Sequence, residues 1–167
     1  MLKLLGILLV IICGAGLGAR ASCRLKKNAE LCVCVSTFLS ELGILMRYSG
    51  DTLFTLFSML HERQSIHELV FLNVLLNEMS GGTDFPCAWR KAVSGDKMLT
   101  PELSGLLLSL GECLGTSDID GQLMSLERAQ EELSAIYEGV LSQYRRKGRL
   151  YRSIGLLGGI TAALLLC

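Results

Sequence analysis

The sequence predicts an all-α protein, a bundle of about six helices between an N-terminal and a C-terminal transmembrane helix. Apolar residues recur at spacings of three and four through most of the chain, and no segment of any length alternates apolar and polar residues as a half-buried strand does. Both ends of the chain are apolar runs next to basic clusters. With 167 residues, the chain is long enough for one domain with a modest core.

Each end of the chain carries an uncharged run, residues 4–19 and residues 154–167. The neighbouring bases are Arg20, Arg24, Lys26 and Lys27 after the first run, and Arg145, Arg146, Lys147, Arg149 and Arg152 before the second. Because basic clusters beside a membrane span stay in the cytoplasm, the pattern predicts an anchor over 1–19, a cytoplasmic bundle over 20–149 and an anchor over 150–167. A cleaved signal peptide ending near Ala19 is the alternative for the first run, and the bases after it favour an uncleaved anchor.

Turn and capping residues divide the first half of the bundle into helices. A first helix is expected to end at the turn 49–51, and a second to cover 52–62. Ser65 and Glu68 have the spacing of a capping box, in which each side chain accepts a hydrogen bond from the other residue's backbone N–H. The sequence therefore predicts a third helix that opens at this box and ends at the glycine pair 81–82.

Three further helices are expected in the second half. The fourth covers about 85–93, the fifth runs to a stop at Gly115, and the sixth is long and amphipathic. Their start signals are Asp84 with Pro86, Thr100 with Pro101, and Ser117 or Asp118.

The spacing of apolar residues also predicts which side chains are buried. The inward stripe expected for the last helix is Leu123, Leu126, Gln130, Leu133, Tyr137, Val140 and Tyr144. The core residues expected from all helices together include Trp89, Leu106, Leu110, Leu126 and Leu133.

The charges are unevenly distributed along the chain. All sixteen Asp and Glu residues lie between positions 28 and 144, together with only six bases, so this middle segment carries a net charge of −10. Nucleic-acid binding needs a basic surface that displaces counterions from phosphate. The acidic bundle therefore argues against a nucleic-acid partner.

The chain offers no constellation for catalysis or metal binding. Its seven cysteines include no CxxC pair, which is typical of small buried side chains in a reducing compartment. His61 and His67 are six residues apart, and neither has the partner four residues away that a zinc-binding helix shows. We therefore expect no cofactor, no metal and no enzymatic activity.

Two sets of residues are candidates for protein contacts. The segment 110–122 is the densest polar patch of a leucine-rich hairpin. Its polar residues are interpreted either as residues that only end one helix and cap the next, or as a recognition loop. The partner-binding candidates are Glu112, Asp118, Asp120 and Gln122 in this segment, and Glu127, Glu131 and Glu138 on the outer face of the last helix. Small residues that allow close packing of membrane helices are Gly14 and Gly18 in the first anchor, and Gly155, Gly159 and Ala163 in the second.

Several short motifs occur in an order that resembles a known family. They are Met1-Leu-Lys-Leu-Leu-Gly, Leu110-Gly-Glu, Leu114-Gly115 with Asp118 and Gln122, and Leu156-Leu157-Gly158. With the long acidic helix and the two anchors, they make the chain similar to the stage III sporulation protein AB family of endospore-forming bacteria. The resemblance covers essentially the whole length, and the richness in Cys and Leu departs from the family's pattern.

The resemblance implies a fold and a role. The family's soluble part is similar to the cytoplasmic helical domain of the F-type platform proteins of type II secretion. The implied role is a non-enzymatic scaffold, double-pass in the outer forespore membrane with its soluble domain on the mother-cell side, in the channel complex between mother cell and forespore. The implied partners are a secretion-type ATPase, other membrane proteins of the channel and lipids, and a homo-oligomer is compatible with this role. The alternative is a secreted or membrane helical protein with an unrelated redox or enzymatic role.

Overall fold

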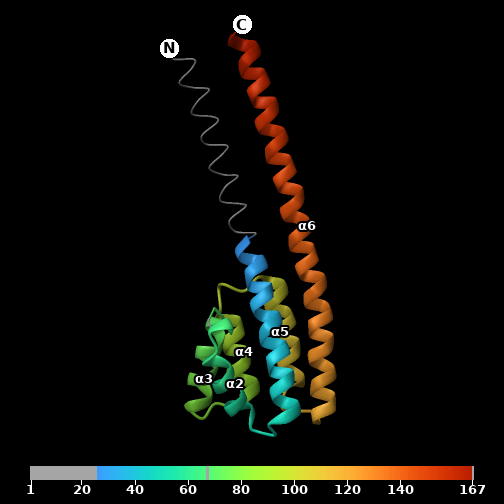
Figure 1. The fold of residues 1–167 in the computed structure, drawn as a ribbon. Coiled ribbons are helices and arrows are strands. Elements are labelled where there is room, and N and C mark those ends of the chain that lie inside the picture. The colour runs from blue at the N-terminus through green and yellow to red at the C-terminus, as the bar shows by residue number, and fades with distance from the viewer. Residues whose placement is uncertain (1–25, 67, 167) are drawn as a thin grey trace. The chain divides into compact units, whose positions relative to one another are not determined.

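The computed structural model describes the backbone of residues 26–66 and 68–166, and the side chains of these residues as far as Gln143, apart from Ser65. Within these residues the chain is all-helical, with six α-helices, one short 3-10 turn and no strand (Figure 1). This confirms the predicted all-α class and the number of helices. Residues 30–137 form one compact unit, the body, and the residues before and after them are assigned to a second unit. The domain limits expected near residues 20 and 149 stay a prediction.

The helix Lys26–Tyr48, here called the N-terminal helix, lies between α6 on one side and α2 to α4 on the other (Figure 1). Its buried residues are Leu31, Cys32, Cys34, Val35, Phe38, Leu39, Leu42 and Met46, so a wide apolar face of this helix points into the body. It ends at residue 48, as predicted, and Gly50 follows with φ 61°, a left-handed conformation that glycine adopts without strain.

The other helices follow the predicted order. They are α2 (Leu53–His61), α3 (Val70–Ser80), α4 (Phe85–Gly95), α5 (Pro101–Cys113) and α6 (Ile119–Leu166). Thr52 caps α2 by accepting a hydrogen bond from Thr55 N, and Thr100 caps α5 in the same way through Leu103 N. These starts were visible in the sequence because each capping residue lies within three residues of the amide that it satisfies.

The start of α3 differs from the prediction. Gln64–Ile66 form a 3-10 turn, and α3 begins at Val70 with no side-chain cap from its own N-cap residue. The capping box predicted at Ser65 and Glu68 is therefore wrong. The carboxylate of Asp96, at the end of α4, supplies the cap instead, because its Oδ2 accepts a hydrogen bond from Phe71 N at 3.1 Å.

Aromatic rings from four helices hold the body together. Phe38 of the N-terminal helix, Phe57 of α2, Phe71 of α3 and Phe85 of α4 all have ring centroids within 6.5 Å of the indole of Trp89. Four of the five phenylalanines thus pack on the single tryptophan, which is almost fully buried. The other predicted core residues, Leu106, Leu110, Leu126 and Leu133, are also buried, which confirms the expected core.

The inward face of α6 is rotated slightly from the prediction. Its buried residues in the body are Gln122, Leu126, Ala129 and Leu133, whereas Leu123, Gln130 and Tyr137 are only half-buried. Of the predicted stripe, Leu126 and Leu133 are buried as expected, whereas Leu123, Gln130 and Tyr137 lie at the edge of the contact. This face packs on the N-terminal helix, where Gln130 Nε2 donates to Ser40 Oγ at 3.1 Å.

One described helix, Lys26–Tyr48, is long and apolar enough to cross a membrane. Eight of its residues are buried in the body. A helix in the core of a bundle can have the same length and apolar composition. Residues 1–19 lie outside the described part, and over 150–166 only the helical backbone of α6 is described. The two predicted membrane anchors therefore stay predictions.

Candidate functional site

The candidate site is the α5–α6 hairpin, which we define as residues 110–122. α5 ends at Cys113, and Gly115 then turns the chain with φ 77°. A Cβ placed on Gly115 would lie 3.1 Å from Leu53 Cδ1, so this turn also sits close against the start of α2. The predicted stop at Gly115 is confirmed, and its cause is both the left-handed backbone and the close approach.

Side-chain hydrogen bonds to the backbone fix the shape of the turn. Thr116 Oγ1 donates to Glu112 O at 2.9 Å, and Ser117 Oγ donates to Cys113 O at 3.0 Å. These bonds satisfy carbonyls that the end of α5 leaves without helical partners. Asp118 Oδ1 accepts a hydrogen bond from Gly121 N at 3.0 Å, which caps α6 as predicted.

Gln122 is buried behind this turn and only 8% exposed. Its Nε2 donates to Ser117 O at 2.7 Å, which ties the first turn of α6 to the loop. Its Oε1 is buried and has no hydrogen-bond partner in the structure. Among the partner-binding candidates, Gln122 is thus placed to hold the loop in shape rather than to present itself at the surface.

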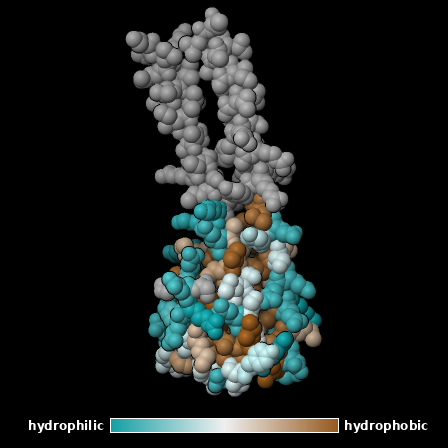
Figure 2. Space-filling model, viewed as in Figure 1, coloured by the Kyte–Doolittle hydropathy of each residue, from teal (hydrophilic) through white to brown (hydrophobic). Residues whose placement is uncertain are grey.

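The acidic candidates are all exposed. Glu112, Asp118 and Asp120 lie on the hairpin, and Glu127 and Glu131 continue along the outer face of α6, so these five define the acidic ridge. Glu138 is also exposed, but it belongs to the second unit. None of the five makes an ion pair with another described residue. Figure 2 shows hydrophilic residues along the edge of the body where Figure 1 places α6.

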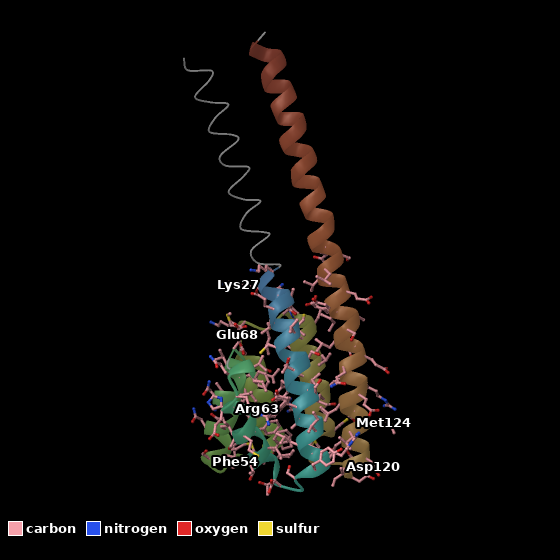
Figure 3. All side chains as sticks on the ribbon, viewed as in Figure 1. Lys27, Phe54, Arg63, Glu68, Asp120 and Met124 are labelled. Atoms are coloured by element: carbon pink, nitrogen blue, oxygen red, sulfur yellow. The ribbon has the colours of Figure 1, made fainter. Side chains whose placement is uncertain are left out.

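Two large apolar side chains are exposed among these acids. Ile119 is 55% exposed and Met124 is 53% exposed. Figure 3 labels Asp120 and Met124 on the first turns of α6. Arg128 reaches back along the helix, and its Nη2 lies 3.4 Å from Met124 Sδ. These two side chains were not predicted from the sequence, because Ile119 and Met124 fall outside the stripe that defines the buried face.

A glycine in α5 anchors the hairpin to the aromatic core. Trp89 Nε1 donates to Leu107 O at 2.7 Å, and a Cβ placed on Gly111 would overlap the indole at Cδ1 and Nε1. Only a residue without a side chain lets Trp89 lie against α5 in this way. This gives a physical reason for the glycine in the Leu110-Gly-Glu motif, which the sequence alone did not supply.

The remaining candidates lie outside the described side chains. Gly14 and Gly18 are in the part of the chain that the structure does not describe, and Gly155, Gly159 and Ala163 lie on the backbone of α6 without described side chains. Among the described residues no group of three or more His, Cys, Asp and Glu side chains could hold a metal ion. Burial raises the pKa of the Cys32 and Cys34 thiols, which keeps them protonated and weakly nucleophilic.

The described part of the chain is thus an all-helical body with an exposed acidic hairpin between α5 and α6. The family model described as stage III sporulation protein AB matches residues 3–167, and the chain belongs to this family. This confirms the resemblance seen in the sequence and gives the chain a role in sporulation. No curated protein and no solved structure matches the chain.

Proposed function

We propose that this protein is a non-enzymatic membrane scaffold of the channel complex between mother cell and forespore, and that its α5–α6 hairpin docks a secretion-type ATPase. The family assignment supports a role in sporulation. The observation that carries the docking proposal is the exposed acidic ridge with two exposed apolar side chains, Ile119 and Met124, among its acids.

The hairpin has the properties of a preformed docking surface. Its turn is held by hydrogen bonds that the side chains of Thr116, Ser117 and Gln122 donate and that of Asp118 accepts, so binding costs little ordering of the loop. The exposed apolar pair offers a site for packing, while the acids around it offer complementarity to a basic surface.

Charge should contribute mainly to the rate of encounter. Residues 28–144 carry a net charge of −10, and the acids of the ridge make no ion pair with another described residue, so their field is available to a partner. A basic patch on the ATPase would be attracted over about one Debye length, roughly 10 Å at 0.1 M salt. Binding should therefore weaken as the salt concentration rises.

The test is equilibrium binding of the full chain, in detergent, to the purified ATPase at low and high salt. The test variant combines Glu112→Lys, Asp118→Asn and Asp120→Lys, since asparagine keeps the cap on Gly121 N that lysine would remove. A second variant combines Glu127→Lys and Glu131→Lys. We expect both variants to bind more weakly than the wild type and to lose most of the salt dependence.

The matched control reverses three exposed acids elsewhere in the body, Asp51, Glu62 and Asp84, to lysine. Asp84 is an N-cap residue without a side-chain hydrogen bond, so its replacement removes no capping bond. The control should bind much more tightly than the two ridge variants, because it leaves the contact surface intact and weakens only the long-range attraction. Wild-type affinity in both ridge variants would show that the ATPase contacts another surface.

A further inference from the structure

The charge of α6 changes sign along the helix. Residues 119–138 carry five acids and one base, whereas residues 139–166 carry five bases and no acid. All five of these bases lie within residues 145–152, directly before the uncharged end of the same helix. We define these five bases as the basic stretch: Arg145, Arg146, Lys147, Arg149 and Arg152.

The positive charge of the basic stretch is not neutralised along α6. The backbone is helical from Ile119 to Leu166, so residues three and four positions apart are neighbours on the helix surface. The acid that comes nearest in the sequence is Glu138, seven residues before Arg145. Ion pairs along α6 therefore cannot cancel this charge, and an anionic ligand can use it.

A second basic cluster comes before the body in the sequence. Lys26 and Lys27 are the first described residues of the N-terminal helix, and both are exposed. Figure 3 labels Lys27 at this end of the helix. In the sequence, Arg20 and Arg24 precede them and follow the uncharged run 4–19. Each apolar end of the chain therefore adjoins a cluster of at least four bases.

Both clusters belong to the same unit of the structure. Residues 1–29 and 138–167 form this unit, and residues 30–137 form the body. The unit contains ten Lys and Arg residues and one acid, Glu138, so its net charge is +9, whereas the net charge of the body is −9. Within their own unit, the bases of the two clusters therefore have a single acid as a possible partner.

The residue types of the basic stretch fit phosphate groups at the surface of an apolar layer. Four of its five bases are arginine, whose guanidinium group donates two parallel hydrogen bonds to two phosphate oxygens. By helical register, Arg145, Arg149 and Arg152 share one face of α6. Tyr144 and Tyr151, seven residues apart, share a neighbouring face, and tyrosine is enriched at the headgroup level of membranes.

Clusters of this size do more than orient a membrane protein. A modest excess of Lys and Arg on one side of a span suffices for orientation, whereas four to eight bases beside a span also attract anionic headgroups, by about 5-fold in affinity per base. We propose that the basic stretch of α6 binds the headgroup phosphates of anionic phospholipids. This proposal rests on the part of the proposed function that places the chain in a membrane, and it does not depend on the ATPase.

The test is lipid binding by the full chain in micelles of dodecyl maltoside, a neutral detergent. Phosphatidylglycerol with a fluorescent acyl chain is titrated into the micelles, and binding is followed by fluorescence anisotropy. Phosphatidylcholine with the same label is the neutral comparison. Phosphatidylglycerol should reach half-saturation at a mole fraction at least about 5-fold lower than phosphatidylcholine does, and this difference should shrink as the salt concentration rises.

The test variant combines Arg145→Gln, Arg149→Gln and Arg152→Gln. Glutamine and arginine have similar helix propensities, so α6 should stay helical. The variant should need at least about 5-fold more phosphatidylglycerol for half-saturation, while its binding of phosphatidylcholine should not change.

The matched control removes three exposed bases of the body and so changes the net charge equally. It combines Arg47→Gln, Arg90→Gln and Lys97→Gln, and it should bind both lipids as the wild type does.

Four results would overturn the proposal while leaving the membrane anchors in place. They are equal binding of the two lipids by the wild type, wild-type affinity in the test variant, an equal loss in the control, and displacement of phosphatidylglycerol by inorganic phosphate but not by chloride at the same ionic strength. The last result would reveal a site for soluble phosphate. Binding of neither lipid would instead contradict the membrane anchors themselves, and the lipid proposal would fall with them.

Discussion

The side chain of Asp96 caps α3 through Phe71, although the two residues are 25 positions apart. Asp96 Oδ2 accepts the hydrogen bond from Phe71 N at 3.1 Å, and Oδ1 accepts another from Met98 N at 2.8 Å. One carboxylate thus satisfies the start of α3 and shapes the turn after α4. Loss of this side chain should loosen both elements together.

We therefore expect Asp96→Ala to lower the free energy of unfolding by about 0.5–2 kcal/mol, the usual cost of losing an N-cap. Asp96→Asn should cost less, because its amide oxygen still accepts one of the two bonds. The control is Asp84→Ala, since Asp84 caps α4 without a side-chain hydrogen bond. Urea unfolding of the full chain in mild detergent measures all three. An Asp96→Ala variant as stable as wild type would mean that the bond contributes nothing.

Two glycines of α5 should respond in opposite ways to alanine. Gly111→Ala would push a methyl group into the indole of Trp89, and we expect a loss of about 1–3 kcal/mol, typical of overpacking. Gly105 is exposed with open space around it, so Gly105→Ala should raise stability by about 0.4–1 kcal/mol. Thermal unfolding followed by circular dichroism, with Trp89 fluorescence as a second probe, measures both. Equal effects of the two changes would contradict the packing of Trp89 on Gly111.

The buried thiols of Cys32 and Cys34 should make stability fall at alkaline pH. Burial raises their pKa in the folded chain, whereas in the unfolded chain they ionise near the usual value of about 8.5. The contribution of the two buried thiols to the free energy of unfolding is therefore complete below about pH 8.5 and is lost as the pH rises through their folded pKa. The reason is that the thiols of the unfolded chain lose their protons at a lower pH than those of the folded chain.

The measurement is the urea midpoint at about pH 7.5 and about pH 10, for the wild type and for a variant with both Cys32 and Cys34 changed to Ala. The variant should be less stable at both pH values, since it leaves cavities, but it should lose less stability between them. An identical loss in both proteins would show that other groups cause the pH dependence.

The small residues of the C-terminal anchor should matter for assembly and not for membrane attachment. Gly159→Leu adds bulk where helices are expected to pack closely, and it also raises hydrophobicity. We expect the variant to stay in the membrane fraction and to co-purify less with other proteins of the channel. Gly159→Ala, which keeps a small side chain, is the control. Unchanged co-purification of the leucine variant would place helix packing elsewhere.

Local signals in the sequence were sufficient for most helix ends. Thr52, Thr100 and Asp118 each lie within three residues of the amides that they cap, so the pattern is readable without the fold. The start of α3 was not readable, because Asp96 reaches it from another helix. The capping box predicted at Ser65 and Glu68 relied on hydrogen bonds between neighbouring residues. In the structure, the hydrogen bond from Phe71 N to Asp96 caps α3 instead.

Sequence pattern also predicted the buried face of α6 only in part. Hydropathy favoured Leu123 and Tyr137 over Gln122 and Ala129, yet the latter are buried. Gln122 is inside because its amide donates to Ser117 O, a reason that hydropathy does not express. The exposed acids of the hairpin were readable, whereas the contact of Gly111 with Trp89 requires the packing of α4 on α5.

The central claim is that the hairpin touches the ATPase, and site-specific photo-crosslinking in sporulating cells tests it most directly. A photoreactive amino acid replaces Asp120 in one strain and Glu62 in another, both exposed positions of the full chain. We expect the probe at position 120 to crosslink to the secretion-type ATPase and the probe at position 62 not to do so. Crosslinks to the ATPase from position 62 and none from position 120 would contradict it.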